Sequence, residues 1–413
     1  MKVSYLLSLS IIIYLGSANV LSAQDGAFIY GKVTTFSGNS YQGQIRWGNE
    51  ETYWSDIFNS VKTRDTNLKY LSLDDRKEKD GDRKGLLGID WKILSIWEDE
   101  YSRTSHQFTS QFGDIKTLEM RGSDRVRLTL KNGVEFNLKG GSNDLGATIN
   151  IYDFELGKIG LQWSRVERVD FSNTPIQLAE NFGDPLYGVV RTTRKGNFEG
   201  LIWWDQDENI GTDKLDGDIR SEDVSIEFHK IKSIEKDGHG SQVSLYSGKQ
   251  LYLVGSNDVN HENRGITVSV AEVGAVKIPW SDFVRVDFEK KPDLSAFYYN
   301  NFNIPVGITG TVKIIDNQNV TGSIIFDLDE AWEFEMLEGD DDKIEYQIPF
   351  RNIKKIIPKN YNYSIIELKN GESLLLGDRR DVSERNDGVL VFIPGNEDPT
   401  YIRWKRIDEI ILN

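Results

Sequence analysis

Histidine is the side chain most often used to move protons near neutral pH, and this chain has only four. They are His106, His229, His239 and His261. No two of them stand at the spacing of metal ligands and the chain has no cysteine, so a zinc site is not expected. The run His239-Gly240-Ser241 suggests nucleophilic catalysis, but its glycine is typical of a hairpin turn. The sequence contains no nucleophile elbow, phosphate loop or dinucleotide fingerprint, and we predict a protein that is not an enzyme.

Aspartate offers a second kind of chemistry, because carboxylate oxygens suit Ca²⁺. A glycine-rich loop ends in aspartate three times, and the candidate ligands are Asp144, Asp258 and Asp381. In the alternative interpretation each aspartate accepts backbone N–H bonds and shapes the turn. The third loop carries Arg379 and Arg380, which compete with a cation. The structural interpretation is therefore favoured, and no cofactor is expected.

The remaining acids are too numerous for a catalytic pair to be nominated by counting. The densest runs are Asp205-Gln206-Asp207-Glu208 and Gly339-Asp340-Asp341-Asp342, with a charged insertion at residues 74–84 in a comparable place. Such variable polar segments are expected in loops, where contacts with partners concentrate. Adjacent strand residues face opposite sides, so one of two neighbouring tryptophans is expected to be exposed. The candidate contact residues are Trp203, Trp204, Asp205, Asp207, Asp340, Asp341 and Asp342.

The N-terminus predicts export. Lys2 precedes an almost wholly apolar run, and Ala23 offers a small residue before a cut ahead of Gln24. Residues 1–23 are therefore expected to be a signal peptide. The run is short for a membrane span, no second run approaches membrane length, and no cysteine follows for a lipid anchor. We expect a secreted, periplasmic or cell-surface protein.

Composition narrows the class of partner. The formal charge of −16 repels phosphate backbones, so nucleic-acid binding is not expected. Without disulfides the exported chain must be held by its own cores, and the 11% of aromatic residues supply large side chains for them. The length of 413 residues suggests two to four domains.

Regular spacings predict three tandem copies. Each copy opens with two glycines twelve residues apart and an aromatic residue four after the second. Each closes with an aromatic residue followed at three-residue steps by apolar residues, as in Trp280-x-x-Phe283-x-x-Val286. The predicted copies are residues 24–174, 175–291 and 292–413.

A weaker symmetry divides each copy into two half-units. The halves share the opening spacing, as in Val33, Gly38, Tyr41 and Gly43. The closing signature also occurs in the middle of the second and third copies, whereas in the first copy only Ile93 and Ile96 match and Trp91 is displaced by one residue. Asn-Gly pairs such as Asn132-Gly133 predict hairpins, and the three-residue steps predict a 3₁₀ turn before each last strand.

Four or five short strands with a 3₁₀ step, in about 45 residues, are the composition of a small SH3-like barrel. The half-units resemble Sm-like and PRC-type small barrels, through a glycine after the first strand and a later aliphatic-x-glycine. The resemblance implies a fold and no activity. The predicted fold is thus all-β, with three tandem pairs of SH3-like half-units. A six-bladed propeller is the alternative, because a blade also needs four strands in a similar length.

Three functions stay open on the sequence. The first is a non-enzymatic exported protein that binds a protein or glycan of the cell envelope through tandem small barrels. The second is a carbohydrate-directed protein, either a glycan-binding module or a hydrolase with an unrecognised carboxylate pair. The third is a structural spacer whose loops bind nothing.

Overall fold

The computed structural model describes residues 24–62, 67–72, 106–140, 144–175, 178, 181–290 and 292–413. The chain is 54% strand, its sheets are antiparallel, and the part described forms no helix of seven or more residues. The prediction of an all-β protein is thus confirmed. Over the same ranges no helix is long and apolar enough to cross a membrane. The predicted signal peptide lies outside them.

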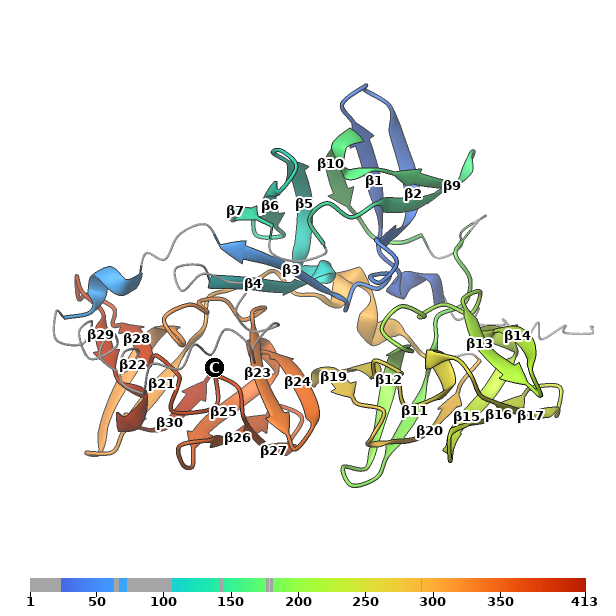
Figure 1. Ribbon diagram of the computed structural model, residues 1–413. Coiled ribbons are helices and arrows are strands. Elements are labelled where there is room, and N and C mark those ends of the chain that lie inside the picture. Colours follow the sequence, from blue (N-terminus) through green and yellow to red (C-terminus); the bar gives the residue numbers. More distant parts are fainter. Residues whose placement is uncertain are drawn as a thin grey trace, which may run out of the picture.

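Strands β1–β10 and their loops are called unit 1, which is the upper lobe of Figure 1. Its alternating strands bury one face, and short turns join them. The elements are η1 (Gln24–Ala27), β1 (Tyr30–Thr35), β2 (Ser40–Trp47), β3 (Ile57–Lys62), η2 (Asn67–Tyr70), β4 (His106–Gln111), η4 (Phe112–Asp114), β5 (Ile115–Met120), β6 (Arg125–Leu130), β7 (Glu135–Lys139), β8 (Ile149–Asp153), β9 (Gly157–Leu161), η5 (Trp163–Arg165) and β10 (Val166–Phe171).

Strands β11–β20 form unit 2, at the lower right of Figure 1. They are β11 (Tyr187–Thr192), β12 (Asn197–Trp203), β13 (Lys214–Ile219), β14 (Glu222–Glu227), η6 (Phe228–Lys230), β15 (Ile231–Asp237), β16 (Gly240–Leu245), β17 (Gln250–Leu253), η7 (Asn257–Val259), β18 (Ile266–Val270), β19 (Gly274–Ile278) and β20 (Phe283–Phe288). A linker with η8 (Ser295–Phe297) and η9 (Tyr299–Asn301) follows.

Strands β21–β30 form unit 3, at the lower left of Figure 1. They are β21 (Thr309–Ile314), β22 (Gln318–Ile325), β23 (Met336–Asp341), β24 (Ile344–Pro349), η10 (Phe350–Asn352), β25 (Ile353–Pro358), β26 (Tyr363–Leu368), β27 (Ser373–Gly377), β28 (Val389–Phe392), β29 (Thr400–Ile402), η11 (Trp404–Arg406) and β30 (Ile407–Leu412).

One order of strand pairing occurs in all three units. In unit 1 it runs β4-β3-β7-β6-β5-β10-β1-β2-β8-β9. Unit 3 pairs its ten strands in the same order, from β24 to β29. Unit 2 differs only in that β13 and β14 form their own ribbon, joined to β17 by the bridge between Asp218 and Val254. The order of strand pairing therefore recurs, but the three sequence copies and their boundaries remain a prediction.

The two predicted half-units interleave within each unit. The opening hairpin β1–β2 pairs with β10 and β8 of the second half. The hairpin β6–β7 pairs in turn with β5 and β3 of the first half. No sheet closes, so separate SH3-like barrels are not confirmed, and sheets of ten and eighteen strands are unlike propeller blades. Local spacing encodes hairpins, whereas the choice of partner for a free hairpin edge depends on contacts distant in sequence.

The paired glycines lie where strands approach most closely. Gly31 and Gly43 oppose each other on β1 and β2. A Cβ on Gly43 would stand 1.6 Å from the carbonyl oxygen of Tyr152, and one on Gly31 would stand 2.4 Å from that of Asp170. The equivalent pairs, Gly188 with Gly200 and Gly310 with Gly322, meet backbone oxygens at 2.0 to 2.2 Å. The spacing of twelve is therefore a cross-strand pair that only glycine fits.

The closing signature of the first half-unit lies later than the sequence analysis placed it. Residues 91–96, where it was sought, fall outside the described ranges. The turn that precedes β5 is Phe112–Asp114, and Ile115 and Leu118 follow at the expected steps. It matches Phe228–Lys230 and Phe350–Asn352 in the other units. Phe112, Ile115 and Leu118 stand at exact three-residue steps, whereas Trp91 stands only two residues before Ile93, so the later match also fits the spacing better.

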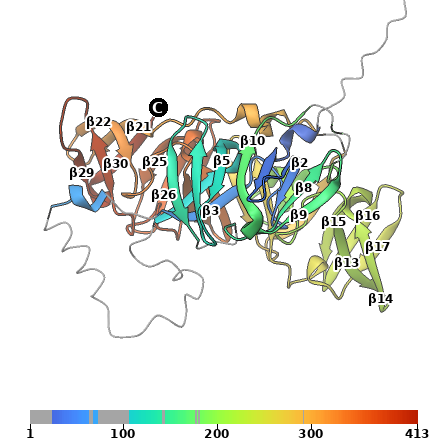
Figure 2. The same cartoon turned by 90° about the horizontal axis from the view of Figure 1, so that it is seen from above.

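The three units lie against one another (Figures 1 and 2), and three apolar clusters join them. One cluster runs continuously through units 2 and 3, whose sheets join where β19 pairs with β24. A second fills unit 1 and includes Phe334 of unit 3. A third lies between units 1 and 2 and includes Phe297 from the linker.

The β19–β24 contact gives a first prediction. Gly274 begins β19, and a Cβ there would lie 2.2 Å from the backbone oxygen of Gln347 in unit 3. Gly157 begins the equivalent strand β9 and has no atom within 4 Å of such a Cβ. Both glycines have positive φ, so alanine is strained at either by about 1–2 kcal/mol. We expect Gly274→Ala to lower the free energy of unfolding in urea by at least that much more than Gly157→Ala. Equal losses would contradict the close approach.

Candidate functional site

Three equivalent loops include Trp204, Asp205 and Asp207 from the residues singled out by the sequence. They follow β2, β12 and β22 and comprise residues 47–56, 204–213 and 326–335, which we call the acidic loops. Each begins with a buried aromatic residue, has a glutamate four residues later and another acid nine residues later. The aromatic residue and the glutamate are bridged through their backbones in every loop.

The acid at the ninth step shapes each loop. In unit 1 the Oδ2 atom of Asp56 accepts the backbone N–H groups of Thr52 at 2.6 Å and of Tyr53 at 2.9 Å. A carboxylate that accepts two successive N–H groups fixes a tight turn. The equivalent acceptors are Asp213, with Asn209 and Ile210 as donors, and Glu335, with Ala331 and Trp332 as donors. Sequence reasoning missed these three acids, although their constant distance from the aromatic residue would have revealed them.

The three aspartates considered as calcium ligands lie behind these loops and are buried. The Oδ2 atom of Asp144 accepts the N–H of Asn59 at 2.5 Å. Asp258 and Asp381 accept the N–H groups of Asp216 and Glu338, both at 2.7 Å. Among the residues placed by the structure, no three acids or histidines are grouped so as to hold a metal ion. Each aspartate thus accepts a backbone N–H, but the donor lies on β3, β13 or β23 and not in the aspartate's own turn.

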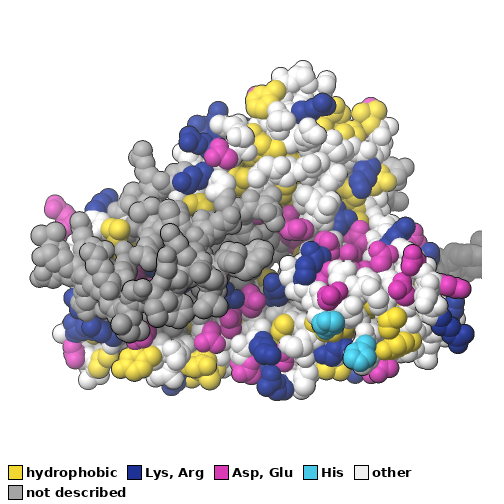
Figure 3. Space-filling model, viewed as in Figure 1, with side chains coloured by type: hydrophobic (Ala, Val, Ile, Leu, Met, Phe, Trp, Pro, Cys, Tyr) yellow, Lys and Arg dark blue, Asp and Glu magenta, His cyan; other side chains and the backbone are white. Residues whose placement is uncertain are grey.

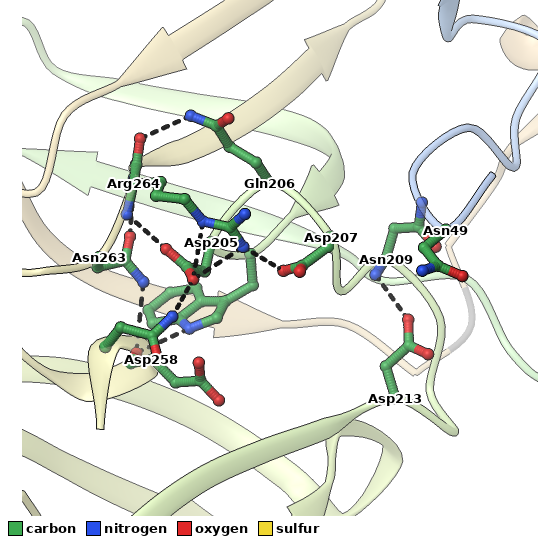
Figure 4. Close-up of polar contacts among 12 residues, drawn as sticks. Asn49, Asp205, Gln206, Asp207, Asn209, Asp213, Asp258, Asn263 and Arg264 are labelled. Atoms are coloured by element: carbon green, nitrogen blue, oxygen red, sulfur yellow. Dashed lines mark hydrogen bonds and ion pairs between the residues drawn. The ribbon is translucent and has the colours of Figure 1, made fainter. Parts of the chain in front are cut away.

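In unit 2 the predicted contact acids surround one arginine (Figure 4). Asp205 is fully buried, and its Oδ2 accepts from Nη2 of Arg264 at 3.0 Å. Asp205 also accepts from Asn257 and from the backbone N–H of Arg264. Asp207 accepts from the same guanidinium at 2.7 Å. These acids are therefore neutralised within the unit.

Two acids of the run Gly339-Asp340-Asp341-Asp342 in unit 3 contact unit 2. Asp341 and Asp342 lie 2.7 and 3.2 Å from Nζ of Lys195 in unit 2. Asp340 pairs with Arg379 at 2.9 Å inside unit 3. Part of the acidic run predicted to contact a partner thus contacts the neighbouring unit.

Both tryptophans are buried. Trp204 is fully buried in unit 2 and donates from Nε1 to the carbonyl oxygen of Asp258 at 2.9 Å. Trp203 does face the opposite side, as predicted, but is only 8% exposed because unit 1 covers it. It packs edge-on against Tyr53 at 5.3 Å and donates to the carbonyl oxygen of Glu50. The expected exposed aromatic platform is a joint between units.

The acidic loop of unit 2 binds an arginine side chain of unit 1. Arg46 makes two bonds to the carboxylate of Asp213, at 2.9 and 3.1 Å, and donates to the backbone oxygen of Asp207 at 2.8 Å. The side chains of the pair are only 11% and 17% exposed. Thr52 also donates to the amide oxygen of Asn209. The acid that shapes the loop therefore also fixes the position of unit 1.

The acidic loop of unit 3 does the same with a different cation. Nζ of Lys62 in unit 1 lies 2.5 Å from Glu335 and 2.8 Å from Asp329. Burial alone would lower the pKa of Lys62, but the two carboxylates raise it above its usual range. A second pair links the same units, because Arg351 holds both carboxylate oxygens of Asp114. Asp213 of unit 2 and Glu335 of unit 3 occupy equivalent loop positions, and both bind cationic side chains of unit 1.

In the part of the chain that the structure describes, Ser241 is not hydrogen-bonded to any of the histidines considered earlier. Ser241 is fully buried, and its Oγ donates to the carbonyl oxygen of Val259 at 2.9 Å. His239 and His261 are exposed, while Nδ1 of His229 lies 3.0 Å from the backbone oxygen of Gly211. The side chain of His106 lies outside the described residues.

Comparison with known proteins gives no relative. No family model, curated protein or solved structure matches this chain. Function must therefore be argued from its own geometry.

Buried carboxyl groups in the acidic loops and beside them have raised pKa values, which make the stability of the fold depend on pH. Burial raises the pKa of Asp144 and of Asp327 to about 7. Burial and the neighbouring Asp207 raise the pKa of Glu208 to about 10. The hydrogen bond from Arg285 lowers the pKa of Asp287. Groups of this kind affect stability only at lower pH than the groups with raised pKa.

We predict that stability falls as pH rises from 5 to 8. Unfolded carboxyls ionise near pH 4, so in this window the folded chain binds more protons than the unfolded chain. The free energy of unfolding then decreases as pH rises through the folded pKa values. We expect the melting temperature to be roughly 5 °C lower at pH 8 than at pH 5, measured by circular dichroism. Glu208→Gln should reduce this difference, and an equal or higher melting temperature at pH 8 would refute the prediction.

Proposed function

We propose that this protein is an exported, non-enzymatic scaffold that binds a macromolecule of the cell envelope. The observation that carries the proposal is the use of the acidic loops as joints. Lys62 and Arg46 of unit 1 each bind a loop acid of a neighbouring unit, and Trp203 lies buried at one of these contacts. Acidic residues of the kind expected for catalysis or cation binding thus hold the three units in fixed positions.

A fixed arrangement of units suits a scaffold, because a rigid body binds without ordering itself first. The contacts that would need to be lost for the units to separate are buried ion pairs and an apolar cluster. On the face seen in Figure 3, acidic side chains gather on unit 2 next to unit 1, and apolar side chains lie at the top of unit 1. Both surfaces are available to an envelope partner.

The carbohydrate-directed alternative has less support. Trp203 and Trp204 are both buried, so neither offers an exposed ring on which a sugar could stack. A retaining or inverting hydrolase needs two carboxyl groups facing a substrate. The carboxylates of Asp205, Asp258 and Asp381 instead accept backbone N–H bonds.

The proposal is tested by capture from an envelope extract. The mature chain, starting at Gln24, is immobilised and compared with the same chain unfolded before coupling, with calcium and with a chelator. We expect the folded bait alone to retain a specific component in both conditions. Protease treatment of the extract then separates a protein partner from a glycan. Retention by neither bait, or release of sugar fragments that Glu208→Gln abolishes, would contradict the scaffold.

A further inference from the structure

One strand edge already joins two units inside this molecule. β19 of unit 2 pairs with β24 of unit 3 in antiparallel register, with Val276 opposite Tyr346. The preceding turn packs on unit 3, since Val273 is 5% exposed and its carbonyl oxygen accepts from Asn352. Units of this kind therefore associate edge to edge through these two strand positions.

The strand equivalent to β19 in unit 1 has a free edge. β9 has the same place in the pairing order, and among the strands described it pairs only with β8. Its first residue, Gly157, has open space where Gly274 meets Gln347. The turn before it exposes two large apolar side chains, with Phe154 66% and Leu156 67% exposed. Leu156 stands in the position of the buried Val273.

The strand equivalent to β24 in unit 2 is free as well. β14 precedes the turn Phe228–Lys230 as β24 precedes Phe350–Asn352, and within the described chain it pairs only with β13. Both free strands lie at the outside of the molecule, away from unit 3 (Figures 1 and 2). Unpaired backbone N–H and C=O groups on such edges are templates for another strand.

The two free edges also match in charge and polarity. The register of β19 and β24 places Ile159 opposite Val224, and both are partly buried apolar residues. It places the exposed Lys158 opposite Ser225, with the acids Asp223 and Glu227 diagonally on either side. Opposite charges at such diagonal positions stabilise a strand pair.

We propose that β9 of one molecule pairs with β14 of a second copy of this chain. The contact joins two different surfaces, so it is heterologous, and repeated use links copies head to tail into rings or open chains. The strand addition supplies backbone hydrogen bonds, and Leu156 is covered as Val273 is inside the molecule. The inference extends the proposed function without depending on it, since a monomeric scaffold can still capture an envelope component.

Cysteine cross-linking tests the register directly, because the chain has no cysteine of its own. Gly160 and Asp223 are opposite each other in the proposed pair. A mixture of the full-length mature Gly160→Cys and Asp223→Cys proteins should form a disulfide-linked heterodimer under mild oxidation. Gly160→Cys mixed with Ile315→Cys, an exposed position in unit 3, is the matched control. A heterodimer yield no higher than that control would overturn the proposal, and so would preferential linkage of Gly160→Cys to itself.

Sedimentation of the cysteine-free chain measures the assembly. We expect a concentration-dependent series of species, and about tenfold weaker association for Lys158→Glu, because two attractive diagonal pairs become repulsive. Adding Asp223→Lys and Glu227→Lys to a second copy should restore association with Lys158→Glu. A monomer at all concentrations overturns the assembly while leaving capture of an envelope component unaffected. Association that Lys158→Glu leaves unchanged also overturns it.

Discussion

Arg351→Ala is expected to lower the free energy of unfolding by about 3–5 kcal/mol. The guanidinium makes two bonds to Asp114, at 2.7 and 2.6 Å, and donates to the side-chain oxygen of Gln111 at 2.8 Å. The side chain of Asp114 has no exposed surface, so the variant leaves a buried carboxylate without its cation. Urea unfolding of the chain from Gln24 to Asn413, followed by fluorescence, measures the loss.

Two controls separate this effect from simple truncation. Arg285 also forks onto an aspartate, Asp287, but within one unit and with side chains 28% and 31% exposed. Arg285→Ala should cost no more than about 1 kcal/mol, because water screens the pair. Asp114→Asn in the Arg351→Ala background should recover part of the loss by removing the unpaired charge. Similar losses for the two arginines would mean that the joint between units 1 and 3 contributes nothing special.

Trp203→Ala is the second large effect, and we expect a loss of about 3–5 kcal/mol. The indole fills the apolar cluster between units 1 and 2 and donates to the carbonyl oxygen of Glu50 at 3.2 Å. Its removal leaves a cavity beside Tyr53 and takes away one of the two donors to the carbonyl oxygen of Glu50, which keeps its hydrogen bond from Nδ2 of Asn209. Thermal unfolding at pH 5 measures the loss, and Trp203→Phe should restore most of the packing.

Trp203 also distinguishes the scaffold from glycan binding. Were the side chain a sugar platform, its replacement would reduce glycan retention and leave stability nearly unchanged. Tyr361 is 74% exposed and serves as the control, since Tyr361→Ala should alter stability by less than about 0.5 kcal/mol. A Trp203→Ala protein as stable as the Tyr361→Ala protein would contradict its burial between the units.

Local features of the fold followed from the sequence. The Asn132-Gly133 pair does connect β6 and β7, and Gly133 has the positive φ that this turn needs. Three-residue steps located the 3₁₀ turns at Phe228, Phe350 and Trp404. These features depend on residues within a few positions of one another, which spacing records directly.

Pairings distant in sequence could not be predicted in the same way. Strand spacing does not say whether β2 finds its partner within its own half-unit or in β8 of the other half. The opposite faces of Trp203 and Trp204 were anticipated, but the covering of Trp203 by unit 1 depends on contacts more than a hundred residues away. The joints were missed for the same reason, since Arg46 and Asp213 carry no mark of each other in sequence.

The central claim is that the acidic loops act as joints that make three units one body. Scanning calorimetry of the chain from Gln24 to Asn413 at pH 5 tests it most directly. The account predicts a single cooperative transition for the natural sequence, and separate transitions once Arg46→Ala and Lys62→Ala break the joints between unit 1 and the acidic loops of units 2 and 3. Two or three resolved transitions in the natural sequence, unchanged by these substitutions, would contradict it.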